Sequence, residues 1–216
     1  MPILLAGLVF WFTKDQPKTY TSNTTIYTGI ATGSSIVSLE DAKFDLFGTR
    51  AAFDNLINII KERNTIEEVG IRLFATHLML NESKTKIILK KNYQELINII
   101  PDEVKGLVVK NNYERTLENL KEYKNKDHRN FIYELLNYEH PHYSIKKISS
   151  KLQIGRVQTS DLIEITYKSD DPGICKNTLD ILIKVFIKEY TYLKVNQSDA
   201  VVQYFQSQLD NAVIKL

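Results

Sequence analysis

The chain has 216 residues, of which 43% are hydrophobic and 25% are charged, so it can bury a core in one or two domains. Its net charge is only +2, and basic residues are interleaved with acidic ones, which argues against nucleic acid as a partner. The single cysteine, Cys175, excludes an internal disulfide framework.

The N-terminal segment from Ile3 to Phe12 is an uninterrupted apolar run. A membrane-spanning helix needs about 20 such residues, so the run covers half of one. We expect residues 1–16 to be part of a transmembrane helix whose beginning is missing, with Trp11 at the interface and Lys14 at the exit. The alternative is a buried strand of a soluble domain.

The next segment, Thr19 to Thr28, is dense in β-branched and aromatic residues and is a predicted strand. A Gly/Ser/Thr-rich loop is predicted at 29–35. From Asp45 onward the apolar period changes, which predicts a helical middle of the chain. One predicted helix has its apolar face at Phe53, Leu56, Ile57 and Ile60, and a later one at Tyr93, Leu96, Ile97 and Ile100. Two short helices follow, the first with Phe131, Leu135 and Tyr138 and the second with Ile145, Ile148 and Leu152.

Three residues are expected to set helix boundaries in this region. Thr65 is a predicted N-cap, with Glu68 completing a capping box. Pro101 is expected to end the third helix, and Ser144 to cap a later one. The most charged stretch, 111–126, is predicted to be a solvated helix whose thin apolar side carries Leu117 and Leu120.

Two strands are predicted near the end, one at 153–158 broken by Gly155 and one at 161–168 with strict alternation. Strands therefore bracket the helical middle. We expect the first and penultimate strands to pair in one sheet with helices on one face. The predicted fold class is α+β, a small mixed β-sheet with helices packed on it and a long protruding C-terminal helix.

That helix is expected to begin at Asp171 and Pro172, because aspartate accepts hydrogen bonds at an N-cap and proline suits the first helical position. If it continues to Leu216, it is roughly 65 Å long at about 1.5 Å per residue. A compact domain of this size has a radius of gyration of about 17 Å, so the helix must project. Its side chains expected to pack or to contact other subunits are Phe186, Tyr190, Tyr204 and Phe205.

The helical pattern stops without a capping glycine, so we expect the chain to be a piece of a longer one. The expected organisation is a partial transmembrane helix at 1–16, an α+β domain at 17–172 and the start of an extended helix at 173–216.

The search for catalytic motifs returns no Walker loop, Rossmann fingerprint, Gly-x-Ser-x-Gly elbow or zinc-protease helix. We interpret His77 as a core histidine and Asp170 as an acid of the helix-capping region. Cys175 is interpreted as a packed or exposed thiol. Glu139-His-Pro-His142 brings two histidines together without a third fixed ligand. No catalytic, cofactor or metal site is therefore predicted.

Two stretches carry a resemblance to a known family. Tyr20-Thr-Ser-Asn-Thr-Thr-Ile-Tyr27 after the apolar run, and Asp161 to Pro172 leading into the long helix, resemble the periplasmic domain of chain-length determinant proteins. These are polysaccharide co-polymerases of the Wzz and GumC type. The resemblance is clearest over 17–35 and 143–216.

The resemblance implies a non-enzymatic domain at the cell inner membrane that faces the periplasm. It would form homo-oligomeric rings and regulate the length or export of O-antigen, capsule or exopolysaccharide chains. Its partners would be the polysaccharide polymerase, the growing glycan chain and the lipid bilayer. Larger members add a cytoplasmic tyrosine autokinase, which would lie outside this chain.

Two alternatives stay open on the sequence alone. One is a periplasmic metal-dependent hydrolase that uses Glu139, His140 and His142. The other is a soluble intracellular interaction module in which Ile3 to Phe12 forms a core strand.

Overall fold

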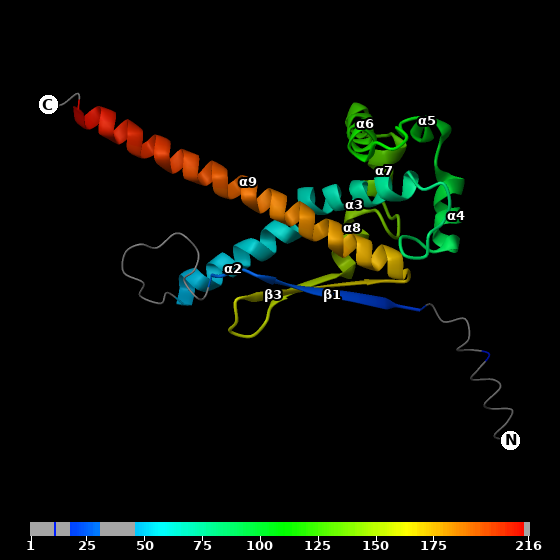
Figure 1. The fold of residues 1–216 in the computed structure, drawn as a ribbon, viewed down its shortest axis with the longest axis horizontal. Helices are drawn as coiled ribbons and strands as arrows, with labels where there is room; N and C mark the ends of the chain where they lie inside the picture. Colours follow the sequence, from blue (N-terminus) through cyan, green and yellow to red (C-terminus); the bar gives the residue numbers. More distant parts are fainter. Residues whose placement is uncertain (1–10, 12–17, 31–45, 214–216) are drawn as a thin grey trace, which may run out of the picture.

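The computed structural model describes residue 11 and residues 18–30 and 46–213, with side-chain environments for residues 11, 18–30 and 48–193. In this part of the chain an α+β fold combines a three-stranded sheet with helices (Figure 1). The elements in chain order are β1 (Tyr20–Tyr27), α2 (Leu46–Lys61), α3 (Arg63–Leu78), α4 (Lys90–Ile99), α5 (Asp102–Lys105), α6 (Tyr113–Lys126), α7 (Phe131–Asn137), α8 (Ile145–Lys151), β2 (Leu152–Arg156), β3 (Leu162–Ser169) and α9 (Pro172–Val213).

The sheet has the order β1-β3-β2, and both of its strand pairs are antiparallel. Tyr20 lies opposite Ser169 and Tyr27 opposite Leu162. The small sheet was predicted, but two of its details were not: both strand pairs are antiparallel, and the first strand pairs with the last strand, β3, instead of the penultimate one. A tight turn after Arg156 makes β2 and β3 a hairpin, and β1 then adds to the free edge of β3. Gly155 does not break β2.

The sheet uses one face for packing. Ile163, Ile165 and Tyr167 of β3 are fully buried, while Glu164 and Lys168, which alternate with them, are exposed. The alternation predicted from the sequence is thus confirmed, because successive side chains of a strand point to opposite faces. Figure 1 shows α9 and α2 along the covered side of the sheet.

Two hydrophobic clusters meet along α3. The first lies between the sheet, α2, α8 and the first half of α9, and it includes Phe53, Ile66 and Leu179. The second joins α3 to the helices α4–α7, and Phe74 and Tyr143 are among its largest members. Because α3 contributes to both clusters, it is buried on most sides, and it fixes the helical lobe relative to the sheet.

The start of α3 differs from the predicted capping box. The helix begins at Arg63, and Glu62 precedes it without a side-chain cap. Only one residue separates α2 from α3, so Thr65 already lies inside the helix, where its Oγ1 donates to the Ile59 carbonyl at 2.8 Å. The α2–α3 junction is therefore closed by a buried threonine instead of a capping box.

The C-terminal helix α9 spans 42 residues, which is a length of about 63 Å at about 1.5 Å per residue. It starts beside the end of the sheet where β1 begins, runs back across the sheet and extends past the opposite end (Figure 1). The predicted continuous and protruding helix is confirmed as far as Val213.

Candidate functional site

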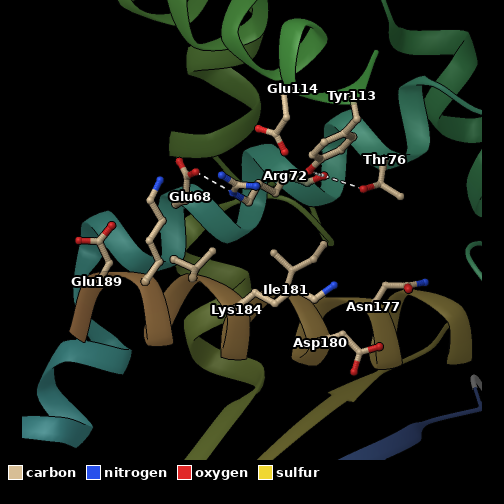
Figure 2. A pocket seen from close by; sticks show the side chains of 12 residues that line it. Glu68, Arg72, Thr76, Tyr113, Glu114, Asn177, Asp180, Ile181, Lys184 and Glu189 are labelled. Carbon is tan, nitrogen blue, oxygen red and sulfur yellow. Dashed lines mark hydrogen bonds and ion pairs between the residues drawn. The ribbon is translucent and has the colours of Figure 1, made fainter. Parts of the chain in front are cut away.

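A charged groove separates the helical lobe from α9 (Figure 2). Its volume is about 550 Å³. One wall comes from α3 and the start of α6, and the other is the face of α9 between Asn177 and Glu189. The lining residues are Glu68, Arg72, Thr76, Tyr113, Glu114, Asn177, Asp180, Ile181, Lys184, Val185, Lys188 and Glu189.

The most buried charges of this groove are paired. Glu68 contacts Arg72 Nε at 2.7 Å and Lys121 Nζ at 2.7 Å. Burial acts to raise the pKa of Glu68, but the hydrogen bonds from Lys121 and Arg72 outweigh it and lower that pKa. Glu68 is therefore a fixed carboxylate at neutral pH, and it ties α6 to α3.

Two hydroxyl groups of this wall are also hydrogen-bonded. Tyr113 Oη donates to the Arg72 carbonyl at 3.2 Å, and burial raises the pKa of the Tyr113 phenol. Thr76 Oγ1 donates to the same carbonyl at 2.9 Å. The lining residues thus present fixed charges of both signs, which suits contact with a polar molecule.

The start of α9 is a second polar centre, and it is fully enclosed. Asp171 is 0% exposed, and its Oδ1 accepts from the backbone N–H groups of Gly173 at 2.9 Å and Ile174 at 3.1 Å. Its Oδ2 accepts from Leu89 N at 2.7 Å and Asn92 Nδ2 at 2.9 Å. One carboxylate therefore caps α9 and anchors the start of α4. The structure places Asp171 and Pro172 at the helix start, where the sequence predicted them.

The turn before α4 presses directly on the first turn of α9. A Cβ added to Gly173 would lie 2.5 Å from the Ile87 carbonyl carbon and 2.6 Å from its oxygen. Asn177 Nδ2 reaches the same carbonyl oxygen at 3.4 Å. The position requires glycine because a side chain would collide with this backbone.

Histidines gather next to this joint. His77 is fully buried, and its Nδ1 lies 2.7 Å from Tyr143 Oη. Its Nε2 has no hydrogen-bond partner. Burial, together with the nearby His142, lowers the pKa of His77 to about 3. The sequence identified His77 as a core histidine, but it gave no signal for Tyr143, the ring that His77 contacts.

The metal cluster considered for Glu139, His140 and His142 is not assembled. The Glu139 carboxylate instead pairs with Lys146 Nζ at 2.7 Å, and the hydrogen bond from Lys146 lowers the pKa of Glu139. His142 Nδ1 faces Asp170 Oδ1 at 3.8 Å. Within 18–30 and 46–213 no group of three potential ligands is placed to hold a metal ion.

Cys175 is a packed thiol, as one of the two interpretations expected. It is 0% exposed, and its Sγ lies 3.1 Å from the Tyr167 carbonyl oxygen and 3.5 Å from that of Tyr20. The thiol therefore sits between the base of α9 and two strands of the sheet, and it has no access to a substrate.

The packing residues expected on α9 divide into two groups. Phe186 is 4% exposed in the core, and Tyr190 stacks on it with ring centroids 5.8 Å apart. The side chains of Tyr204 and Phe205 lie outside the described side chains, although their backbone is helical. Thus Phe186 and Tyr190 contact their own domain.

The apolar run from Ile3 to Phe12 also falls outside the described residues, apart from Trp11, which is helical. No described helix combines the length and the apolar composition that crossing a membrane requires.

The groove was not predicted from the sequence. Its walls come from three helices that are far apart in the chain, so no single segment of the sequence contains the groove. The pairing of Glu68 with Lys121 could have been suspected only if α6 had been known to lie on α3.

Comparison with protein-family models, with curated proteins and with solved structures finds no match to this chain.

Proposed function

We propose that this chain is a non-enzymatic scaffold domain of the polysaccharide co-polymerase type. Copies of the domain would associate side by side at the membrane and regulate the length or export of a polysaccharide, with no bond made or broken by the domain. The observation that carries the proposal is the course of α9, which leaves the sheet at one end and extends far beyond the other (Figure 1).

The base of α9 has the rigidity that a positioning element needs. Asp171 accepts two hydrogen bonds from the first turn of α9 and two more from the start of α4, and Phe186 still lies in the core fourteen residues after the helix begins. The direction of the projecting part is therefore set by the domain and not by a hinge.

The outer part of α9 carries apolar side chains that the domain leaves uncovered. Ile187 is 53% exposed, Tyr192 63% and Leu193 38%. At about 100° per residue these three side chains point to different sides of the helix. A helix with apolar groups on several sides requires partners in more than one direction, and two neighbouring copies in a ring meet that requirement.

The arrangement also suits a membrane anchor. Tyr20, where β1 begins, lies opposite Ser169, just before α9 begins. If residues before Tyr20 lead into the bilayer, α9 points away from the membrane. The scaffold would then hold its free helix in the space where an exported glycan emerges.

The test is a set of substitutions on the outer part of α9 in the full chain. Replacing Ile187, Tyr192 and Leu193 by glutamate puts charges into the proposed subunit contacts, and we expect loss of self-association in sedimentation velocity. Lys176→Glu is the matched control, because Lys176 is also exposed on α9 but lies at its base.

In cells that make the polysaccharide, the triple variant is expected to broaden the glycan length distribution on gels, whereas Lys176→Glu leaves it unchanged. Unaltered assembly and unaltered glycan length in the triple variant would refute the proposal.

A further inference from the structure

Three of the four histidines meet around one tyrosine ring at the base of α9. The centroid of Tyr143 lies 4.6 Å from that of His140, 5.7 Å from that of His77 and 6.4 Å from that of His142. His77 is 0% and His142 5% exposed. Groups that ionise near neutral pH in water are thus concentrated in a site that excludes water.

The turn at 139–144 depends on a neutral imidazole. The backbone N–H of His142 donates to His140 Nδ1 at 3.2 Å. His140 must therefore keep a lone pair on Nδ1 and carry its proton on Nε2. A second proton on His140 turns this acceptor into a donor, so the hydrogen bond inside the turn is lost.

His142 is the second histidine of the turn whose hydrogen bonding depends on its protonation. Its Nδ1 is buried without a hydrogen bond and faces Asp170 Oδ1 at 3.8 Å, which is beyond hydrogen-bond distance. The Asp170 side chain is 51% exposed. A protonated His142 therefore places a charged nitrogen in a buried position without a hydrogen bond, which favours a state in which water reaches the ring.

The charges around His142 come from every element packed on the turn. Three acids favour a proton on His142, namely Asp170 and Asp171 before α9 and Glu95 of α4. Lys151 of α8 opposes it, as do His77 of α3 and His140 of the turn itself when they are charged. Burial is the largest influence, and it lowers the pKa of His142 and takes that of His140 to about 4. Both imidazoles are neutral at pH 7 and take up protons on acidification.

Two side-chain hydrogen bonds hold the turn in its closed form. Lys151 Nζ donates to the Pro141 carbonyl at 2.7 Å, and Ser144 Oγ donates to the His140 carbonyl at 2.9 Å. The first bond joins the middle of the turn to the end of α8, and the second closes the turn on itself, while His142 faces Asp170. Opening of the turn breaks these two bonds and leaves the helical hydrogen bonds of α8 in place.

We propose that the turn at 139–144 is an acid-operated clasp on the base of α9, closed while His140 and His142 are neutral and open when they are protonated. Opening exposes His142 to water and removes its ring from the acids that precede α9. The inference does not depend on the proposed scaffold function.

The experiment is amide hydrogen exchange of the full chain at about pH 7 and about pH 4.5, corrected for the intrinsic pH dependence of exchange. Each proton bound preferentially by the open turn shifts the opening equilibrium by up to about tenfold per pH unit. We expect the corrected exchange of residues 139–144 to rise on acidification before that of α3 in the core.

The variants identify the groups responsible. His140→Asn keeps an acceptor near the position of Nδ1 but binds no proton, and His142→Asn removes the second proton. The double variant is expected to stay closed at the lower pH, whereas His128→Gln, at the fourth and exposed histidine, opens like the parent chain. Equal opening in the double variant, or no opening in the parent chain, overturns the proposal.

A second measurement applies if the double variant does not fold. Asp170→Asn removes the acid that favours a proton on His142 in the closed turn, so the closed turn binds that proton less well and the midpoint of opening must move to higher pH. Imidazole nitrogen shifts followed by NMR would report the weaker proton binding of His142 directly. An unchanged midpoint in Asp170→Asn overturns the proposal.

Discussion

A single carboxylate couples two helices that lie far apart in the sequence. Asp171 caps α9 through Oδ1 and holds the residues that open α4 through Oδ2. The sequence predicted the first of these roles, because an aspartate before a proline and an apolar helix is a recognisable N-cap. The second role required the loop after α3 to fold back onto α9.

Asp171→Ala tests both roles of this residue. Loss of an N-cap costs typically about 1 kcal/mol, and leaving the buried donors of Leu89 and Asn92 unpaired costs about 1–3 kcal/mol more. We expect a loss of about 2–4 kcal/mol in the free energy of unfolding measured with urea at about pH 7.5. Asp170→Ala, at the half-exposed neighbour, is the control and should cost far less; equal losses would contradict the double role.

His77 makes stability depend on pH. Its pKa is about 3 in the folded state because burial disfavours the charged ring, against 6.5 for an unperturbed histidine. Since the unfolded chain binds the proton more readily, the stabilisation is complete above pH 6.5 and falls as the pH decreases towards 3.

The expected loss from His77 alone is about 2 kcal/mol between pH 6.5 and about pH 5. Urea unfolding as a function of pH measures it, and His77→Gln should reduce the slope by about one proton. His128→Gln is the matched control and should keep the slope of the parent chain. An identical slope in His77→Gln would show that this ring does not stay neutral in the folded state.

At the scale of the element, the first turn of α9 lies in close contact with the loop before α4. Replacing glycine by alanine inside a helix normally stabilises it by up to about 1 kcal/mol. Gly173→Ala should do the opposite and cost about 1–3 kcal/mol, because the new methyl group meets the backbone of Ile87.

Gly155→Ala is the matched change in a strand. No atom lies within 4 Å of a Cβ added there, so the variant should be neutral or gain up to about 1 kcal/mol. Thermal unfolding of the two variants side by side measures the difference. A gain at Gly173 would mean that the loop moves away from α9 easily.

The elements were predictable from local patterns, whereas their pairing was not. The alternation in β3 and the apolar period in α2 and α4 depend on neighbouring residues, and the strands and helices formed where expected. The order β1-β3-β2 depends on which edge of a hairpin is free. Thr65 failed as an N-cap because α2 ends only one residue before α3, so the local signal was overridden by the α2–α3 junction.

At the scale of the whole molecule, α9 divides into a supported half and a projecting half. Isolated helices are marginally stable in water, and their stability in proteins comes mostly from packing. The backbone amides of 194–213 should therefore exchange faster than those of 174–186 when copies are dilute.

Self-association should reduce this difference in exchange rate between the two halves of α9. Amide exchange measured over a range of concentrations is expected to show protection of 194–213 that grows with concentration, while 174–186 stays protected throughout. Protection of 194–213 that does not vary with concentration would show that the projecting half needs no second copy.

The groove between α3 and α9 also belongs to this scale. Its lining comes from residues 68–76, 113–114 and 177–189, so it exists only after the helical lobe has packed on the sheet. No periodicity in any one segment reports such a surface. The long helix that forms one wall was predictable, and the opposite wall was not.

The chemical reactivity of the single cysteine, Cys175, reports on the contact between the base of α9 and the sheet. Cys175 lies between α9, Tyr167 and Tyr20, so an alkylating reagent reaches it only after the helix has lifted off the sheet. The labelling rate of the unmodified protein therefore counts how often this junction separates, and it does so with no added probe.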